Sequence, residues 1–114
     1  MDLTTKQKVY LRGLGQSLRP QLHLGHEGLT PGTLSALEDL FRRRELVKVR
    51  LLKTTVEDPK AAAAAMAETA NAAVVGVVGG TFVLYRPNLD LKERIELPAE
   101  SSAPEPGRRS SFRR

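Results

Sequence analysis

A loop bounded by two glycines, Gly25-His26-Glu27-Gly28, is the feature of this sequence with the clearest chemical potential. Glycine allows positive φ angles and a close approach between the backbone and a ligand. Thr30 and Pro31 follow the loop and are typical of a helix start, whose free N–H groups and positive dipole end attract phosphate. The pattern therefore predicts either a phosphate-binding loop or a plain strand-to-helix turn.

Positive charge is concentrated in the same half of the chain. The net charge is +5, and the first 53 residues carry ten Lys or Arg against five Asp or Glu, whereas residues 54–98 carry four against six. A charge distribution divided in this way suits a polyanionic partner. The basic side chains expected to take part are Lys6, Lys8, Arg12, Lys48, Arg50 and Arg86. Any one of these side chains could simply be a solvated surface charge. The prediction of a polyanionic partner therefore depends on their occurrence together with the glycine loop.

The side chains that catalysis or metal binding would need are scarce. His23 and His26 are the only histidines, and there is no cysteine. Two histidines alone make a poor metal site, and we interpret His23 as a strand residue with a satisfied hydrogen bond. Because no nucleophile–base pair is recognisable, we expect no enzyme activity, no metal and no cofactor.

Helix and strand patterns alternate along the chain and must position these residues. Helices are predicted from a cap at Thr4-Thr5 to about Leu18, from Pro31 to a C-terminal end at Arg42-Arg43-Arg44, and from Lys60 to about Ala70. Strands are predicted at 21–24, 46–52, 73–78 and 81–85, with a two-residue Gly79-Gly80 turn before the last. Leu11, Leu14 and Leu18 form the expected buried stripe of the first helix. Gly13 and Gly15 indicate that this helix either bends or meets a close neighbour.

This order predicts an α/β (α+β) domain, α-β-α-β-α-β-β, with a mixed four-stranded sheet whose core face is covered by helices. The domain is expected to span residues 1–98. The composition then shifts to Ser, Pro, Ala and Arg, which predicts a disordered Arg-rich tail over 99–114. There is no apolar stretch that could span a membrane and no apolar core of a secretory signal, so we expect a cytoplasmic protein. We also expect it to be a monomer.

Segments between residues 3 and 98 also carry a family resemblance. They are Leu3-Thr4-Thr5-Lys6-Gln7-Lys8, Tyr10-Leu11-Arg12, Leu24–Thr30, Glu45–Arg50, Gly79–Pro87 and Ile95–Pro98. In this order they resemble the CRM domain family, whose bacterial stand-alone form is the YhbY type. The resemblance implies a fold similar to the C-terminal domain of bacterial translation initiation factor three. It also implies RNA binding and association with precursors of the large ribosomal subunit.

Two positions depart from the family pattern. Glu27 stands in the loop where relatives usually carry a polar or basic residue, and Gly80 stands where they usually carry Lys or Arg. Each departure removes positive charge from the implied RNA surface. The Arg-rich tail could offset that loss.

The sequence thus predicts an RNA-binding assembly factor of the large ribosomal subunit, with rRNA or pre-ribosomal particles as its partner. Lys6, Lys8, Arg12 and Arg86 would contact phosphates, Gly25 to Gly28 would admit the RNA backbone, and Thr30 would hold the helix start. Few aromatic residues are available for stacking, so recognition of RNA shape is expected more than recognition of sequence. The alternative is a protein-interaction module that docks on a ribosomal protein. That alternative predicts an exposed apolar patch and little salt dependence.

Overall fold

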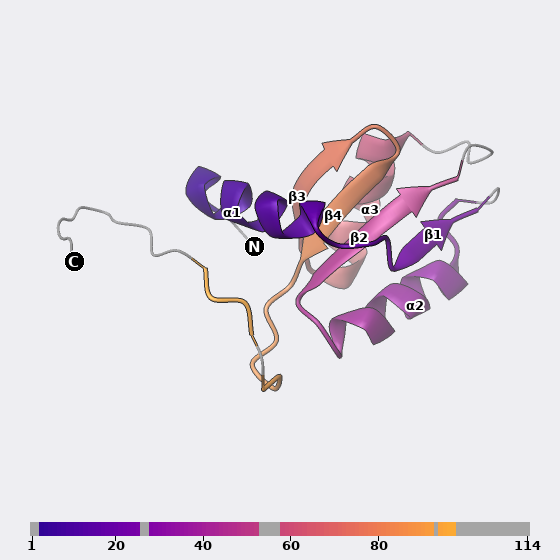
Figure 1. Ribbon diagram of the computed structural model, residues 1–114. Helices are drawn as coiled ribbons and strands as arrows, with labels where there is room; N and C mark the ends of the chain where they lie inside the picture. Colours follow the sequence, from indigo (N-terminus) through magenta and orange to yellow (C-terminus); the bar gives the residue numbers. More distant parts are fainter. Residues whose placement is uncertain (1–2, 26–27, 53–57, 93, 98–114) are drawn as a thin grey trace, which may run out of the picture.

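A computed structural model describes residues 3–25, 28–52, 58–92 and 94–97, and its elements follow the predicted order (Figure 1). The elements are α1 (Thr5–Gln16), β1 (Leu22–Leu24), α2 (Pro31–Phe41), β2 (Leu46–Leu51), α3 (Pro59–Ala70), β3 (Ala73–Val78) and β4 (Thr81–Tyr85). The second helix ends at Phe41, before the three arginines that were expected at its C-terminal end. The first helix ends two residues earlier than expected. The N–H groups of Ser17 and Leu18 bond to carbonyls three positions back, in the tighter turns that often finish a helix.

Local capping signals explain where the elements begin and end. Thr4, Thr30 and Asp58 cap the three helices, and each side chain accepts an N–H bond at 3.1 Å from the residue three positions later. Asn71 ends α3 in the left-handed region with φ of 57°. Gly79 takes φ of 57° in the turn between β3 and β4.

The four strands form one mixed sheet in the order β1-β2-β4-β3, which confirms the expected architecture. β1 runs parallel to β2, and the other two neighbouring pairs are antiparallel. The C-terminal ends of β1 and β2 meet the β3–β4 turn at one end of the sheet. There the N–H of Leu52 bonds to Leu24 at 2.9 Å, and the N–H of Leu51 bonds to Gly80 at 2.7 Å. The glycine loop after β1 therefore starts at this end.

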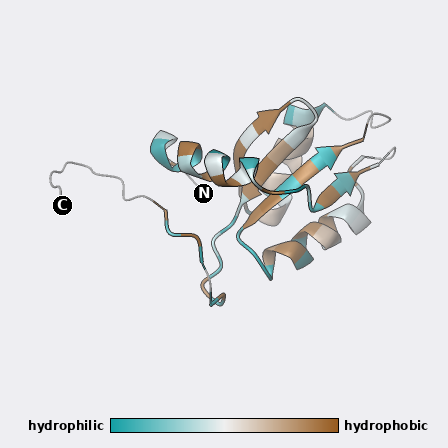
Figure 2. Ribbon diagram, viewed as in Figure 1, coloured by the Kyte–Doolittle hydropathy of each residue, from teal (hydrophilic) through white to brown (hydrophobic). Residues whose placement is uncertain are grey.

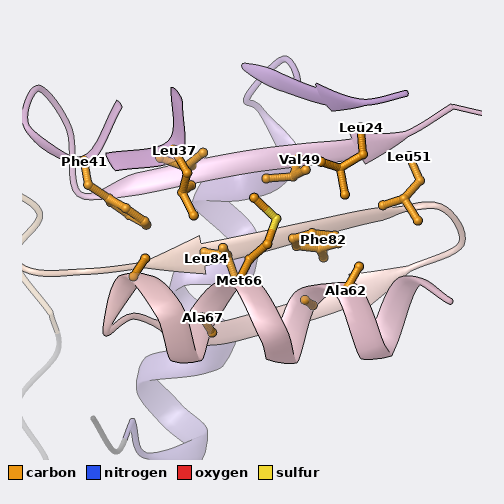
Figure 3. Close-up of a cluster of buried hydrophobic side chains, with 13 residues drawn as sticks. Leu24, Leu37, Phe41, Val49, Leu51, Ala62, Met66, Ala67, Phe82 and Leu84 are labelled. Carbon is orange, nitrogen blue, oxygen red and sulfur yellow. The ribbon is translucent and has the colours of Figure 1, made fainter. Parts of the chain in front are cut away.

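Helices cover both faces of the sheet, and not only the core face for which the sequence predicted them. α2 and α3 pack on one face around a cluster that includes Phe41, Met66 and Phe82 (Figure 3). α1 lies across the other face, where Leu11 is fully buried beside Val83 in a second cluster (Figure 1).

The apolar sequence of β4 accounts for the second core. Its residues alternate between the two clusters, with Phe82 and Leu84 facing α2 and α3, and Val83 and Tyr85 facing α1. A strand that is apolar on both sides needs cover on both sides. Figure 2 shows that β3 and β4 are mainly hydrophobic, whereas hydrophilic positions interrupt β1 and β2.

Gly13 and Gly15 predicted either a bend in α1 or a close neighbour, and the structure shows a close neighbour at Gly15. A Cβ there would lie 3.1 Å from Cγ2 of Val83, whereas a Cβ at Gly13 would meet open space. The buried positions of the helix are consequently Leu11 and Gly15. The predicted stripe was wrong at Leu14, which is 37% exposed.

The chain after β4 returns to the α1 side of the sheet, where Ile95 and Leu97 pack against the second cluster. The described part of the chain ends at residue 97, and the predicted tail over 99–114 lies outside it. Within the described part, no helix combines the length and the apolar character that crossing a membrane requires.

Candidate nucleic-acid interface

The structure brings Lys8 and Arg12 together on the side of α1 that faces β3. The two residues are four positions apart and therefore neighbours on the helix surface, whereas Lys6, two positions from Lys8, faces elsewhere. Nε of Arg12 donates to the carbonyl of Val75 in β3 at 3.3 Å. Lys8 lines a shallow hollow beside Ala73 of the same strand.

Lys48 and Arg50 extend this basic surface across the sheet. Nζ of Lys48 donates to the carbonyls of Gly15 and Leu18, both at 3.1 Å, which places its side chain on the α1 face of β2. Arg50, two residues further along the strand, lies on the same face. It is exposed and makes no ion pair within the described ranges.

The region around Arg50 is the part of the α1 face that α1 leaves open. Arg50 pairs with Thr81 of β4 and with His23 of β1 in the sheet register. His23 is exposed, Thr81 is partly exposed, and Val78 at the end of β3 is 78% exposed. We call this region, with Arg12 and Lys48 at its border, the open sheet face.

The glycine loop lies at the same end of the sheet. The N–H of Gly28 bonds to the carbonyl of Gly25 at 2.9 Å, and Gly28 has φ of 71°, a conformation that favours glycine. His26 and Glu27, the two middle residues, lie outside the described residues.

The start of α2 offers fewer donors to a phosphate than the sequence suggests. Thr30 and Thr33 form a reciprocal capping box, which occupies the backbone N–H groups of both residues, and Pro31 has no N–H. A phosphate at this end of the sheet would consequently depend on the loop backbone and nearby cations more than on the helix terminus.

Arg86 lies on the other face of the sheet, apart from these cations. Its terminal nitrogens donate to both carboxylate oxygens of Glu38 in α2, at 2.9 and 2.8 Å, and to the carbonyl of Ala70 at the end of α3. The guanidinium also lies 4.8 Å from the ring centre of Phe41. The hydrogen-bonded arginine lowers the pKa of the Glu38 carboxyl. Arg86 therefore joins β4, α2 and α3.

Glu45 is an organising residue for which the sequence gives no local signal. It is 3% exposed, and its carboxylate accepts the N–H groups of Asn88 and Ile95, both at 2.7 Å. Nε of Arg94 donates to the same carboxylate at 3.0 Å. All three partners lie more than 40 positions later in the chain. Glu45 thus fixes the returning segment that covers the α1 core.

Metal-ligating side chains do not cluster in the part of the chain that the structure describes. Within those ranges no group of three or more His, Cys, Asp or Glu residues is placed to hold a metal ion.

Burial raises the pKa of the Tyr85 hydroxyl, and the nearby Glu45 carboxylate adds to that effect. Tyr85 belongs to the second core cluster.

Comparisons with a family model and with other proteins agree on the kind of protein to which this chain is similar. The model of the CRS1 / YhbY (CRM) domain matches residues 3–86. An RNA-binding protein of Haemophilus influenzae is 38% identical over 96 residues, covering 84% of this chain and 95% of that protein. A Bacillus subtilis protein, named a probable RNA-binding protein, is 33% identical over 96 residues, covering 84% of this chain and 99% of its own length.

A solved structure shares the fold. The solution structure of a hypothetical Staphylococcus aureus protein, suggested to bind RNA, superposes with a TM-score of 0.73 at 34% identity. The match covers 85% of this chain and 100% of that one.

Proposed function

Because the chain belongs to the CRS1 / YhbY (CRM) domain family, we propose that it binds RNA through the open sheet face and the glycine loop. The observation that carries the proposal is the meeting of Arg12, Lys48 and Arg50 on one face, at the end of the sheet where the Gly25–Gly28 loop begins. Arginine and lysine side chains grouped in this way neutralise successive phosphates of an RNA backbone.

We further propose that the RNA is large-subunit rRNA and that the protein acts in assembly of that subunit in the bacterial cytoplasm, as a monomer and without catalysis. The two relatives are named an RNA-binding protein and a probable RNA-binding protein, which supports RNA as the partner. Few aromatic side chains stand on the open sheet face, so we expect recognition of backbone shape. Residues 99–114, which contribute four Arg and two Glu, would add affinity as a basic extension.

A double substitution tests the interface. Arg12→Gln with Arg50→Gln is expected to lower the affinity for an rRNA fragment about tenfold or more, and to reduce the salt dependence of binding by about two phosphate contacts. The matched control is Arg43→Gln with Arg44→Gln, which removes two charges that precede β2, at the opposite end of that strand. At moderate salt this control should bind nearly as well as the parent, since charges beyond about 8 Å are screened. Equal losses in both variants would refute the proposed location.

Charge substitutions in the glycine loop test whether it approaches phosphate. His26→Asp is expected to weaken RNA binding and Glu27→Lys to strengthen it, most visibly at low salt. Thermal stability is expected to change little in either variant. Equal affinity of both variants and the parent would assign the loop a purely structural role.

One observation favours the alternative of protein docking. Val9, Tyr10 and Leu14 on α1 are 56%, 42% and 37% exposed, and Tyr10 and Leu14 border a groove that also involves Leu91 and Ile95. A partner bound there would cover apolar area and show little salt dependence. The substitutions Arg12→Gln and Arg50→Gln would then leave its affinity unchanged, which separates the two functions.

A further inference from the structure

A pocket opens between the C-terminal half of α1 and the sheet, at the border of the open sheet face. Its volume is about 340 Å³, near the lower end of the roughly 300–1,000 Å³ typical of ligand pockets. It is lined by Arg12, Gly15, Gln16, Lys48, Gly76, Val78, Thr81 and Val83. We call it the Arg12–Lys48 pocket.

The hydrogen-bonding capacity of the pocket is unbalanced in favour of donors. Lys48 has three N–H donors, and the carbonyls of Gly15 and Leu18 take two of them. Arg12 has five donors, and Val75 takes the one on Nε. Among the described residues, the remaining donors of these two side chains have no partner and no Asp or Glu lines the pocket. The chemistry that would complete the pocket is an anion with several acceptor oxygens.

Both cations are held in place by the fold itself. The aliphatic stem of Arg12 lies over Gly76, where an added Cβ would be 3.1 Å from Cγ and Cδ of the arginine. Glycine at this position therefore lets Arg12 lie flat against β3. Lys48 is fixed by its two bonds to the end of α1. Because little side-chain freedom remains to be lost on binding, the pocket is preorganised for its ligand.

The rest of the lining suits a sugar more than a bare ion. Val83 and the exposed Val78 give an apolar wall, while Thr81 and Gln16 add polar groups. An apolar wall with a few polar groups beside two cations matches the combination of ribose and phosphate.

We propose that the Arg12–Lys48 pocket binds one phosphate with its ribose from a non-helical stretch of the RNA strand. This inference rests on the proposed RNA binding and specifies its substrate class. Insertion of a nucleotide between α1 and the sheet requires the strand to leave a regular duplex, as it does in loops and bulges. The protein should then prefer a bulged or looped RNA to an uninterrupted duplex of the same length.

Pocket-filling substitutions without a charge change provide the test. Thr81→Leu places a larger side chain in the pocket, and Gly76→Ala forces the Arg12 side chain to shift from its position against β3. Thr69→Leu, an exposed position on α3, is the matched control. All variants are compared with the full-length parent after their melting temperatures confirm folding. Binding to a bulged hairpin and to the corresponding duplex is measured by fluorescence anisotropy, and uridine monophosphate is titrated into the ¹⁵N-labelled parent.

The expected result is a loss of about tenfold in affinity for the bulged hairpin in Thr81→Leu and Gly76→Ala, a clearly smaller loss for the duplex, and no change for either RNA in the Thr69→Leu control. Uridine monophosphate should shift the amide signals of Gly15, Gly76 and Thr81. RNA binding by the parent without preference for the bulge, or unaltered by both pocket variants, would overturn the pocket and leave the proposed function standing. Failure of the parent to bind either RNA would overturn both.

Discussion

Replacement of Glu45 by Ala is expected to destabilise the domain by about 2–3 kcal/mol and to lower its melting temperature by about 10–20 °C. The substitution leaves the N–H groups of Asn88 and Ile95 and the guanidinium of Arg94 without their shared acceptor. The donors are partly buried, and donors of this kind that lose a charged acceptor bear part of their desolvation cost. Thermal unfolding followed by circular dichroism measures the effect.

Asp39→Ala is the matched control for Glu45→Ala. Asp39 also accepts a bond from an arginine, Arg42, at 3.1 Å, but the two side chains are 58% and 70% exposed. Exposed pairs of this kind contribute about 0–1 kcal/mol. A melting temperature for Glu45→Ala within the range of this control would show that the returning segment is not fixed by the carboxylate.

Replacement of Arg86 by Met is the second substitution with a large expected effect, about 1.5–3 kcal/mol of unfolding free energy. Methionine keeps much of the apolar stem but removes the paired bonds to Glu38 and the bond to Ala70. Arg86→Lys should recover only part of the loss, because an ammonium cannot reproduce the two parallel bonds of a guanidinium. Full recovery with lysine would mean that the paired geometry contributes nothing.

RNA affinity of the same variant decides between two roles for Arg86. The sequence predicts a phosphate contact, whereas the structure shows its terminal nitrogens bonded to Glu38 and Ala70. With its charge used inside the fold, Arg86→Met should keep the RNA affinity of the parent when measured well below its melting temperature. A loss of affinity in the folded variant would assign Arg86 to the interface after all.

Acid titration provides an independent check of the Arg86–Glu38 pair. The pKa of Glu38 is lowered from its ordinary value of 4.5 in the folded state, so the pair stabilises the fold above that value. The contribution is lost as the pH falls through the lowered pKa. The parent should therefore lose stability more steeply than Glu38→Gln on acidification below about pH 4.5.

The helices and strands of this fold begin and end at local capping and turn residues, which is why the sequence predicts them well. Thr30-Pro31, Asp58-Pro59 and Gly79-Gly80 each fix a boundary through the conformation of a few neighbouring residues. The placement of α1 on the opposite face is a tertiary property. Its one available signal was the run of apolar residues in β4, which is buried on both sides.

The candidate site was less predictable because side-chain partners come from distant parts of the chain. Lys48 and Arg86 are indistinguishable from interface cations in the sequence, yet each bonds to groups at least 16 positions away. Glu45 and its partners are separated by up to 50 positions. Periodicity and capping describe single elements, and they carry no information about such pairs.

The measurement that tests the central proposal most directly is the affinity for a large-subunit rRNA fragment as a function of salt. Phosphate contacts by Arg12, Lys48, Arg50 and the glycine loop predict a linear fall of log affinity with log salt. The loss should amount to about ten- to a hundredfold between about 50 and 200 mM. An affinity that stays constant across this range would contradict binding through phosphates. It would favour docking of a protein on the exposed apolar residues Val9, Tyr10 and Leu14 of α1.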